Sequence, residues 1–367
     1  MKKNIMIVTF QNAYNHGAML QCFALQEKIK SFSNDVKVLN YDNKIISNIY
    51  KIFYVNQNNS FAVRYIKALI HGIVFYGQIS RRNKKFRNFI HNNLNITESM
   101  SADEIKRYDY SNYDLFIVGS DQVWNTDLFN GFDDIYFLSF SEKIKKASYA
   151  ASIGKTYIDE RYQDQISNAL RDFKSISLRE ESGKKAISKL TNKELTVDLD
   201  PTLLLKSDDW DKLISPKKIV DDKYILVYMP NQEVIKIADY ISNKEKIKII
   251  DVDKKKNFKG EINMFDSDPL EFVNLVKNAE YIITSSFHAT VFSIIYNKKF
   301  WVVPPKKISS RIDDLLSKLK LNDRVLKDFN DYLDKEKCNN EIDYKSTNML
   351  LDKERRKSID SLKNIID

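Results

Sequence analysis

Glycine is scarce in this sequence, with 8 residues among 367. Average usage of about 7% would give roughly 26, so each glycine merits attention. Glycine after a strand permits positive φ and lets a ligand approach the backbone closely. Four glycines follow an expected strand or open an expected helix: Gly17, Gly119, Gly154 and Gly183. They mark candidate ligand-binding turns, although ordinary turn geometry would explain any one of them.

The glycine-rich phosphate-binding motifs are missing as well. The sequence has no G-x-G-x-x-G and no Walker A pattern, which argues against a dinucleotide or P-loop site. Its two cysteines, Cys22 and Cys338, match no metal-binding spacing and are interpreted as buried thiols. The D-x-D pair of Asp198 and Asp200 abuts Pro201 and is typical of a strand end. We therefore expect no metal and no bound cofactor, and a metal-dependent glycosyltransferase is not favoured.

Long apolar runs are absent too. No stretch reaches the ~18 apolar residues that span a bilayer. The longest candidate, 65–76, is interrupted by Lys67 and His71. The apolar run after the first residues is too short for a signal peptide and ends at Gln11. We expect a cytoplasmic protein.

Acidic residues are missing between Asp42 and Glu98, although the whole chain has 50 of them and a net charge of +9. Nine basic residues lie in this stretch: Lys44, Lys51, Arg64, Lys67, Arg81, Arg82, Lys84, Lys85 and Arg87. The segment 43–97 is also rich in aromatic residues and asparagine, and we expect helices on the outside of the first domain. Because no nucleic-acid-binding motif accompanies the charge, no nucleic-acid partner is expected.

Short apolar runs that alternate with helical patterns predict an α/β protein with parallel sheets. The expected strands are 4–10, 36–41, 113–118, 147–152, 175–178, 195–199, 224–229, 247–251, 281–284 and 300–303. The expected helices are 18–29, 162–173, 269–278, 289–296, 309–319 and 351–365. Ligands of such sheets bind beyond the carboxyl ends of the strands, so the turns there are the expected site.

The length and this pattern predict two Rossmann-like domains that face a cleft. We expect an N-terminal domain at 1–205, with the segment 43–97 as a helical insert, and a linker at 206–222. The C-terminal domain is expected at 223–350. The remaining segment, 351–367, is a charged amphipathic helix that could pack back on the N-terminal domain.

One histidine lies between an expected strand and an expected helix, in the stretch 284–289. A helix N-terminus offers free N–H groups that bind phosphate, and the hydroxyls of Ser285 and Ser286 add donors there. His288 could act as a general acid or base near pH 7. The alternative is a structural histidine, which the residues alone leave open.

Other polar residues also follow expected strands. Arg179 could hold a carboxylate or phosphate bidentately, or pair with a neighbouring glutamate, and Arg311 poses the same choice. Asp121 could bind a sugar hydroxyl or cap a helix. Further candidates for the cleft are Asn15, His16, Gly17, Gln122 and Trp124.

Six motifs occur in an order that resembles the polysaccharide pyruvyl transferase family, from about residue 5 to 320. They are Asn15-His16-Gly17-Ala18, Gly119-Ser120-Asp121-Gln122-Val123-Trp124-Asn125, Ala150-Ala151-Ser152-Ile153-Gly154, Ser177-Leu178-Arg179-Glu180, Asp200-Pro201-Thr202 and Thr284-Ser285-Ser286-Phe287-His288-Ala289. The resemblance implies a GT-B-like fold with the acceptor on the N-terminal domain and the donor on the C-terminal one. It also implies transfer of pyruvate from phosphoenolpyruvate to two sugar hydroxyls, which forms a ketal and releases phosphate.

Two residues match the family's site directly. Arg179 matches the arginine near the donor, and His288 matches the histidine of a Ser-Arg-x-His-type motif. Ser286 stands where many members have arginine, which removes one cation from the donor site. Arg311 or Lys306 is a reasonable substitute.

The acceptor implied by the resemblance is a sugar of a surface polysaccharide or its precursor, which could be lipid-linked. The basic segment 43–97 could then contact the inner membrane, at about 1 kcal/mol per cation, or be an ordinary pair of basic helices. Two other functions stay open: a GT-B-type glycosyltransferase that uses a nucleotide sugar, and a non-catalytic binding protein.

Overall fold

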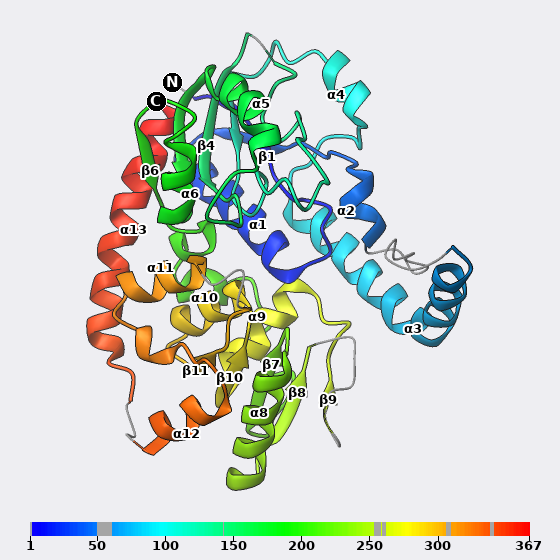
Figure 1. Cartoon of the computed structure of the whole chain (residues 1–367), viewed down its shortest axis with the longest axis vertical. Coiled ribbons are helices and arrows are strands. Elements are labelled where there is room, and N and C mark those ends of the chain that lie inside the picture. Colours follow the sequence, from blue (N-terminus) through cyan, green and yellow to red (C-terminus); the bar gives the residue numbers. More distant parts are fainter. Residues whose placement is uncertain are drawn as a thin grey trace.

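The computed structural model describes residues 2–49, 61–141, 143–252, 258, 262–305, 310–337 and 341–367. In the long helix Phe61–Asn93 (α3), side chains are described from Phe75 onward. The chain forms two α/β lobes, one above the other in Figure 1, and each contains one parallel sheet. The predicted fold of two Rossmann-like units is confirmed.

The N-terminal lobe is built on a six-stranded parallel sheet with the strand order β2-β1-β3-β4-β5-β6. Its strands are β1 (Asn4–Val8), β2 (Asp35–Val38), β3 (Leu115–Val118), β4 (Lys145–Ala151), β5 (Phe173–Leu178) and β6 (Leu195–Val197). In the centre, Ile7 of β1 is in register with Val38 on one side and Ile117 on the other. Strand β3 is buried along its whole length, which a continuous apolar run favours when helices cover both faces.

Within the described residues of this lobe, six helices accompany the sheet. They are α1 (His16–Lys30), α2 (Lys44–Ile49), α3, α4 (Ala102–Arg107), α5 (Glu160–Leu170) and α6 (Glu181–Ile187). Helix α1 starts where the side chain of Asn15 accepts the N–H of Ala18 at 3.2 Å, as an N-cap does. It contacts a helix of the other lobe, which places its first turn at the boundary between the lobes.

The C-terminal lobe is built on a five-stranded parallel sheet in the order β11-β10-β7-β8-β9. The strands are β7 (Tyr224–Tyr228), β8 (Lys248–Asp251), β9 (Ile262–Asn263), β10 (Tyr281–Thr284) and β11 (Lys299–Val302). Its helical elements are α8 (Gln232–Glu245), α9 (Pro269–Asn278), α10 (Phe287–Ile295), α11 (Ser310–Lys318), η2 (Asn322–Arg324) and α12 (Phe329–Lys337). Helix α8 was not expected, although its buried apolar residues have helical spacing.

The segment between the lobes is more structured than a plain linker. The turn η1 (Pro201–Leu204) and the short helix α7 (Ser207–Asp211) precede it or lie within it. Trp210 of α7 is fully buried, with its ring 5.9 Å from Phe23 of α1 and 5.0 Å from Phe292 of α10. Trp210, Phe23 and Phe292 therefore form an aromatic contact that joins helix α1 of the N-terminal lobe to helix α10 of the C-terminal lobe.

The last helix, α13 (Tyr344–Ile366), begins seven residues before the predicted start at 351 and runs along the outside of both lobes (Figure 1). Arg355 donates from Nε to the carbonyl of Leu203 at 2.6 Å, and Ser358 accepts the N–H of Leu199 at 3.0 Å. The amino group of Lys3 bonds the carbonyl of Ile366, so the ends of the described chain lie side by side.

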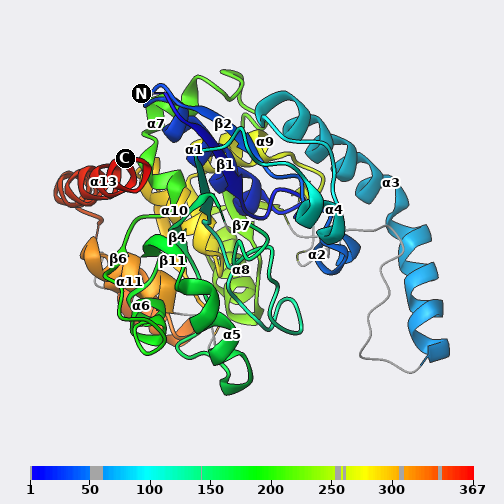
Figure 2. The same ribbon diagram turned by 90° about the horizontal axis from the view of Figure 1, so that it is seen from above.

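Helix α3 leaves the side of the N-terminal lobe and lies along the C-terminal lobe over part of its length (Figure 2). Two of its cations pair with carboxylates there: Arg81 with Asp266 at 2.6 Å and Lys85 with Glu271 at 2.7 Å. Part of the basic segment 43–97 thus stabilises the contact between the lobes. The basic residues at 51, 64 and 67 lie outside the described side chains, and contact with a membrane stays a prediction.

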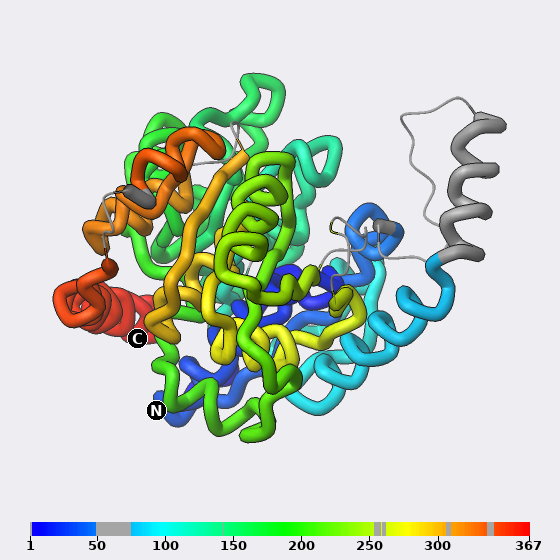
Figure 3. Tube along the Cα trace, turned by 90° about the horizontal axis from the view of Figure 1, so that it is seen from below, coloured from blue at the N-terminus to red at the C-terminus, as the bar shows by residue number. Residues whose placement is uncertain are grey.

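No helix in the described part of the chain has the length and apolar character that a membrane span requires. Seen from below, the tube trace in Figure 3 shows α13 beside the N-terminal residues on one side and α3 on the opposite side. The boundary between the two sheets lies between these helices, and the carboxyl ends of the strands meet there.

Candidate active site

The two lobes bring one cluster of charged side chains together at their boundary. From the N-terminal lobe, Asp121 follows β3, Arg179 follows β5 and Asp200 follows β6. The C-terminal lobe contributes His288 from the first turn of α10 and Arg311 from the start of α11. We use the name charged cluster for Asp121, Arg179, Glu180, Asp200, Phe287, His288 and Arg311 together.

Arg179 is the central cation of the charged cluster. Its Nη1 donates to Asp200 Oδ2 at 2.9 Å, and its Nη2 lies 3.5 Å from Asp121 Oδ1. The guanidinium carbon lies 4.8 Å from the centre of the Phe287 ring, a cation–π distance. Burial opposes its charge, but the surrounding carboxylates of Asp121, Asp200 and Glu180 raise the pKa of Arg179 above its ordinary value.

His288 is positioned by a close approach of the two lobes. A Cβ added at Gly17, in the first turn of α1, would overlap the imidazole atoms Nδ1 and Cγ. On its other edge, Nε2 faces Asp200 Oδ2 at 3.6 Å, beyond hydrogen-bond distance. The structure therefore brings two predicted site residues into contact, and it explains the glycine at position 17 by the ring of His288.

Asp200 contacts both Arg179 and His288. Its Oδ1 accepts from the N–H and the hydroxyl of Thr202, at 3.0 and 2.7 Å, and its Oδ2 faces Arg179, His288 and the hydroxyl of Ser120. Burial alone would raise the pKa of Asp200, but His288, Arg179 and Thr202 together hold it below its ordinary value. A carboxylate that stays ionised here can orient His288 and stabilise an imidazolium.

Arg311 is the second guanidinium of the charged cluster. Its guanidinium carbon lies 5.9 Å from the centre of the Phe287 ring, which Arg179 also approaches. Burial and the neighbouring charge of Arg179 lower the pKa of Arg311 to about 10, partly offset by the nearby carboxylates. The structure thus places a cation near Phe287, between Ser286 and His288 in the chain, where Ser286 itself provides none.

Glu180 completes the charged cluster on the N-terminal side. It is fully buried, and its Oε1 accepts the hydroxyl of Ser152 at 2.8 Å and the N–H of Ile153 at 3.2 Å. Burial raises its pKa, although Arg179 and Arg311 oppose that change.

Hydrogen bonding in the charged cluster is incomplete. Among the described residues, seven buried side-chain polar atoms have no hydrogen-bond partner, and six of them lie in the charged cluster or two residues from it. These six are Arg179 Nε and Nη2, Glu180 Oε2, Ser182 Oγ, His288 Nε2 and Arg311 Nε. Because buried polar groups are almost always paired in native proteins, this concentration points to a site that binds a polar ligand.

The hydroxyl groups of Ser285 and Ser286, which precede His288, form hydrogen bonds with backbone atoms. Ser286 is the N-cap of α10, with its Oγ 3.5 Å from the N–H of Ala289. Ser285 donates to the carbonyl of Met229 at 2.5 Å. Lys306, the other predicted substitute for the absent arginine, lies outside the described residues.

Asn15 and His16, which precede Gly17 in the chain, contact residues of the C-terminal lobe. His16 is fully buried; its Nε2 lies 2.9 Å from the carbonyl of Ser267, and its Nδ1 lies 3.3 Å from the Tyr228 hydroxyl. Asn15 caps α1 and also reaches that hydroxyl, at 3.5 Å. These contacts indicate a structural role for His16. Its side chain is fully buried and has no surface that an acceptor could contact.

The other candidates after β3 have different positions. Trp124 is buried in the N-terminal core, where it stacks on Phe137 and donates from Nε1 to the carbonyl of Tyr136 at 2.9 Å. Its predicted place in a cleft does not fit this burial. Gln122 is half-buried and accepts from the side chain of Asn125 at 2.8 Å.

Besides Phe287, two residues of the charged cluster, Asp200 and Glu180, were not among the predicted site residues. Asp200 was interpreted as a strand end, and it does cap η1, but its second oxygen faces the site. Glu180 was considered only as an ion-pair partner of Arg179. In the described part of the chain, no group of three or more His, Cys, Asp or Glu residues could hold a metal ion.

Comparison with known proteins places the chain in a family. Among solved structures, a UDP-N-acetylglucosamine 2-epimerase from Rickettsia bellii is 15% identical, with a TM-score of 0.51 over 100% of this chain and 96% of that one. An S. aureus MnaA–UDP co-structure is 10% identical, with a TM-score of 0.53 over 95% of this chain and 91% of that one. At these identities the likeness concerns the fold alone.

A search of curated proteins found no match. The family model described as polysaccharide pyruvyl transferase matches residues 15–307, which include every described member of the charged cluster except Arg311. The match covers most of the chain and all six motifs, the first of which begins at the first matched residue. The chain therefore belongs to the polysaccharide pyruvyl transferase family.

Proposed function

We propose that this transferase moves pyruvate from phosphoenolpyruvate to two hydroxyls of a sugar in a surface polysaccharide or its precursor. The product would be a cyclic ketal, and phosphate would be released. The observation that carries the proposal is the set of buried polar atoms without a hydrogen-bond partner around Phe287, which includes three guanidinium nitrogens. Phosphoenolpyruvate offers a phosphate and a carboxylate, which are the groups that guanidinium binds best.

Arg179 and Arg311 have the chemistry to hold this donor. Three of their N–H groups, Nε and Nη2 of Arg179 and Nε of Arg311, are buried and donate no hydrogen bond within the protein, so hydrogen bonds from them to an anion would be stronger than in water. Both guanidiniums lie over Phe287, the residue between Ser286 and His288. In this proposal Arg311 supplies the cation that other family members carry at the position of Ser286.

His288 is proposed as the proton donor. The first acceptor hydroxyl bonds to C2 of phosphoenolpyruvate while His288 protonates the methylene carbon and then takes up the proton of that hydroxyl. A second hydroxyl next bonds to C2, and the bond from C2 to the phosphate oxygen breaks with its electron pair. The departing phosphate carries away the second hydroxyl proton, so His288 ends each cycle as it began. Such proton transfer contributes roughly 100- to 10,000-fold in rate.

Asp200 and Gly17 are positioning residues in this proposal. Asp200 faces Nε2 of His288 and would hold the ring while its protonated form is stabilised by the ionised carboxylate. Gly17 allows the ring to lie against the start of α1. No protein-bound cofactor enters the proposed reaction. The cytoplasm is the proposed location, because phosphoenolpyruvate is made there.

The test is the dependence of phosphate release on both substrates. Purified protein is incubated with phosphoenolpyruvate and a panel of sugars, nucleotide sugars and lipid-linked sugars, and phosphate is measured. Release that requires phosphoenolpyruvate together with one acceptor is the expected result. Release of UDP or GDP from a nucleotide sugar, with no use of phosphoenolpyruvate, would instead establish a glycosyltransferase.

A further inference from the structure

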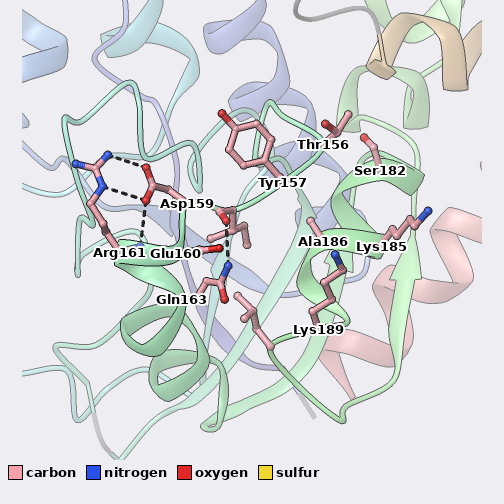
Figure 4. Close-up of a pocket in the computed structure, with 12 residues that line it drawn as sticks. Thr156, Tyr157, Asp159, Glu160, Arg161, Gln163, Ser182, Lys185, Ala186 and Lys189 are labelled. Carbon is pink, nitrogen blue, oxygen red and sulfur yellow. Dashed lines mark hydrogen bonds and ion pairs between the residues drawn. The ribbon is translucent and has the colours of Figure 1, made fainter.

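A large open groove lies beside the charged cluster, on the face of the N-terminal lobe that carries α5 and α6. Its volume is about 900 Å³. We name it the α5–α6 groove; it is lined by Thr156, Tyr157, Ile158, Asp159, Glu160, Arg161, Gln163, Ser182, Lys185, Ala186, Lys189 and Leu190. Figure 4 shows Ser182, Lys185 and Lys189 on the α6 side and Tyr157 and Glu160 across from them.

Both walls of the groove begin at Glu180. The loop after β4 donates to Glu180 Oε1 from Ser152 Oγ and Ile153 N, and it reaches the groove three residues later, at Thr156. Helix α6 starts directly after Glu180 and forms the other wall. Glu180 belongs to the charged cluster, and Ser182, two residues later in the chain, lines the groove, so the groove adjoins the charged cluster along this segment.

The wall formed by α6 and the turn after it has the chemistry for an anion. Ser182 and Lys185 lie three residues apart on one face of α6, and Lys189 lies in the turn, two residues after the helix ends; all three line the groove. Among the described residues, neither lysine pairs with a carboxylate, whereas Arg161 in the same groove is held bidentately by Asp159 at 2.6 and 3.0 Å. The Oγ of Ser182 is buried and has no hydrogen-bond partner.

The opposite wall has the chemistry for a sugar. Tyr157 is 61% exposed, with Lys155 Nζ 5.1 Å from the centre of its ring, and its exposed surface can pack against the apolar face of a pyranose. Glu160 and Gln163 offer oxygen and nitrogen atoms that can bond sugar hydroxyls. Sugar recognition and anion recognition thus face each other across one groove.

We propose that the α5–α6 groove is the acceptor site, and that the acceptor is a sugar joined to a phosphate or diphosphate. Lys185, Lys189 and Ser182 would bind the phosphate groups, and Tyr157 would contact the sugar. This inference rests on the proposed function, because an acceptor is meaningful only beside a donor site. The diphosphate could belong to a nucleoside or to a polyprenyl lipid, and the chemistry of the groove is the same for both.

The test is equilibrium binding without phosphoenolpyruvate. Galactose, mannose and N-acetylglucosamine are titrated calorimetrically, each as the free sugar, the nucleoside diphosphate sugar and a short-chain polyprenyl diphosphate sugar. We expect one or more diphosphate forms to bind at least about tenfold more tightly than the free sugar. The form that binds identifies the source of the diphosphate.

The variant Lys185→Ala/Lys189→Ala should weaken that binding by about tenfold, because both lysines are exposed and each ionic contact that water screens contributes less than a buried one. Lys184→Ala is the matched control, because this neighbouring lysine does not line the groove. Equal binding by the double variant and the wild type would overturn the proposal, as would free sugars that bind as tightly as their diphosphates, or no binding by any diphosphate form.

Failure of this inference can be distinguished from failure of the proposed function. If the double variant transfers pyruvate with an unchanged KM for a sugar diphosphate, the groove is not the acceptor site, while the reaction stands. If the wild type binds sugar diphosphates through these lysines but never consumes phosphoenolpyruvate, the groove assignment survives as a binding site and the pyruvyl transfer is refuted.

Discussion

Two histidines lie at the boundary between the lobes, and the difference between them indicates which one carries chemistry. His16 is fully buried, both of its ring nitrogens have partners, and its ring stacks on Phe272 with centres 4.8 Å apart. His288 touches the same boundary, but its Nε2 is buried without a hydrogen bond. The first is completely satisfied by protein atoms, and the second is not.

The surroundings of the two histidines follow the same contrast. Beside His16, the guanidinium of Arg82 lies between Phe86 and Phe265 and donates to two carbonyl groups. Beside His288, Arg179 and Arg311 keep N–H groups that bond no protein atom. Satisfied polar groups fix how the lobes meet, and we interpret the unsatisfied ones as the proposed ligand site.

The largest effect should come from His288→Asn. Turnover with phosphoenolpyruvate should fall by about 100- to 10,000-fold, because the proton donor is lost. The midpoint of thermal unfolding should change little, since Nε2 makes no hydrogen bond to protein. Steady-state kinetics and thermal unfolding of the same preparation measure both. Unchanged turnover would remove His288 from the mechanism.

Gly17→Ala should be the next largest. The new Cβ would displace the ring of His288, and a misplacement of about 1 Å can cost roughly 100-fold in rate. The effect should vanish in a His288→Ala background, where no ring stands in the way. A double-mutant cycle measures this coupling, and additive losses would contradict the contact between the two residues.

Arg311→Gln should raise the KM for phosphoenolpyruvate by about 10- to 100-fold, as expected for one lost charge-assisted hydrogen bond. Arg81→Gln is the control, because Arg81 pairs with Asp266 on the surface, far along the chain from the charged cluster. If Arg311→Gln leaves this KM unchanged, another group replaces the arginine missing at position 286. Lys306→Gln would then be the variant to measure.

His16→Gln should affect stability and leave the turnover of the folded enzyme nearly unchanged. Loss of the stacking and of one buried hydrogen bond should cost about 1–3 kcal/mol in the free energy of unfolding. Chemical denaturation measures this cost, and a large fall in turnover with unchanged stability would reverse the roles given to the two histidines.

The stability contributed by His16 should also depend on pH. Burial, together with the charge of Arg82, lowers the pKa of His16 well below its ordinary value, against an opposing hydrogen bond to Ser267. The unfolded chain therefore binds a proton that the folded chain does not. Stability is complete above about pH 6.5 and falls below it, by at most about 1.4 kcal/mol per pH unit. Unfolding midpoints at pH 8 and pH 5.5 should differ more in the wild type than in His16→Gln.

The smallest effect should come from Arg81→Ala. Its ion pair with Asp266 joins the lobes, but its side chain is 60% exposed, and such pairs contribute about 0–1 kcal/mol. The change in the free energy of unfolding should shrink further in high salt. A larger, salt-independent loss would show that α3 holds the lobes together more strongly than its surface contacts suggest.

Strands and helices whose apolar residues recur with a clear period were predictable from the sequence. Elements with a weaker pattern were predicted less well. The helix Pro269–Asn278 and the strand Tyr281–Thr284 have their predicted bounds. Helix α8 was missed although Val234, Ile237 and Ile241 have helical spacing and are buried. The helical spacing of these apolar residues, between two short predicted strands, is a signal from which the helix was predictable.

Side chains at strand ends were predictable as candidates, but their roles depend on contacts between distant segments. An aromatic residue such as Trp124 suits a core or a ligand equally well, and only its burial separates the two. The role of Asp200 in the site was not predicted, because an aspartate directly before a proline is already explained as the cap of a turn. The approach of Arg311 to Phe287 comes from the packing of α11 on α10, which no local pattern specifies.

The central claim is tested most directly by the mass of the acceptor after incubation with phosphoenolpyruvate. Sugars, nucleotide sugars and lipid-linked sugars are each incubated with the wild type and with His288→Asn, and analysed by mass spectrometry. The account predicts that the wild type adds one pyruvyl ketal to one acceptor class and that the variant adds almost none. Wild-type protein that leaves every acceptor unchanged, or His288→Asn that forms the ketal at the wild-type rate, would contradict it.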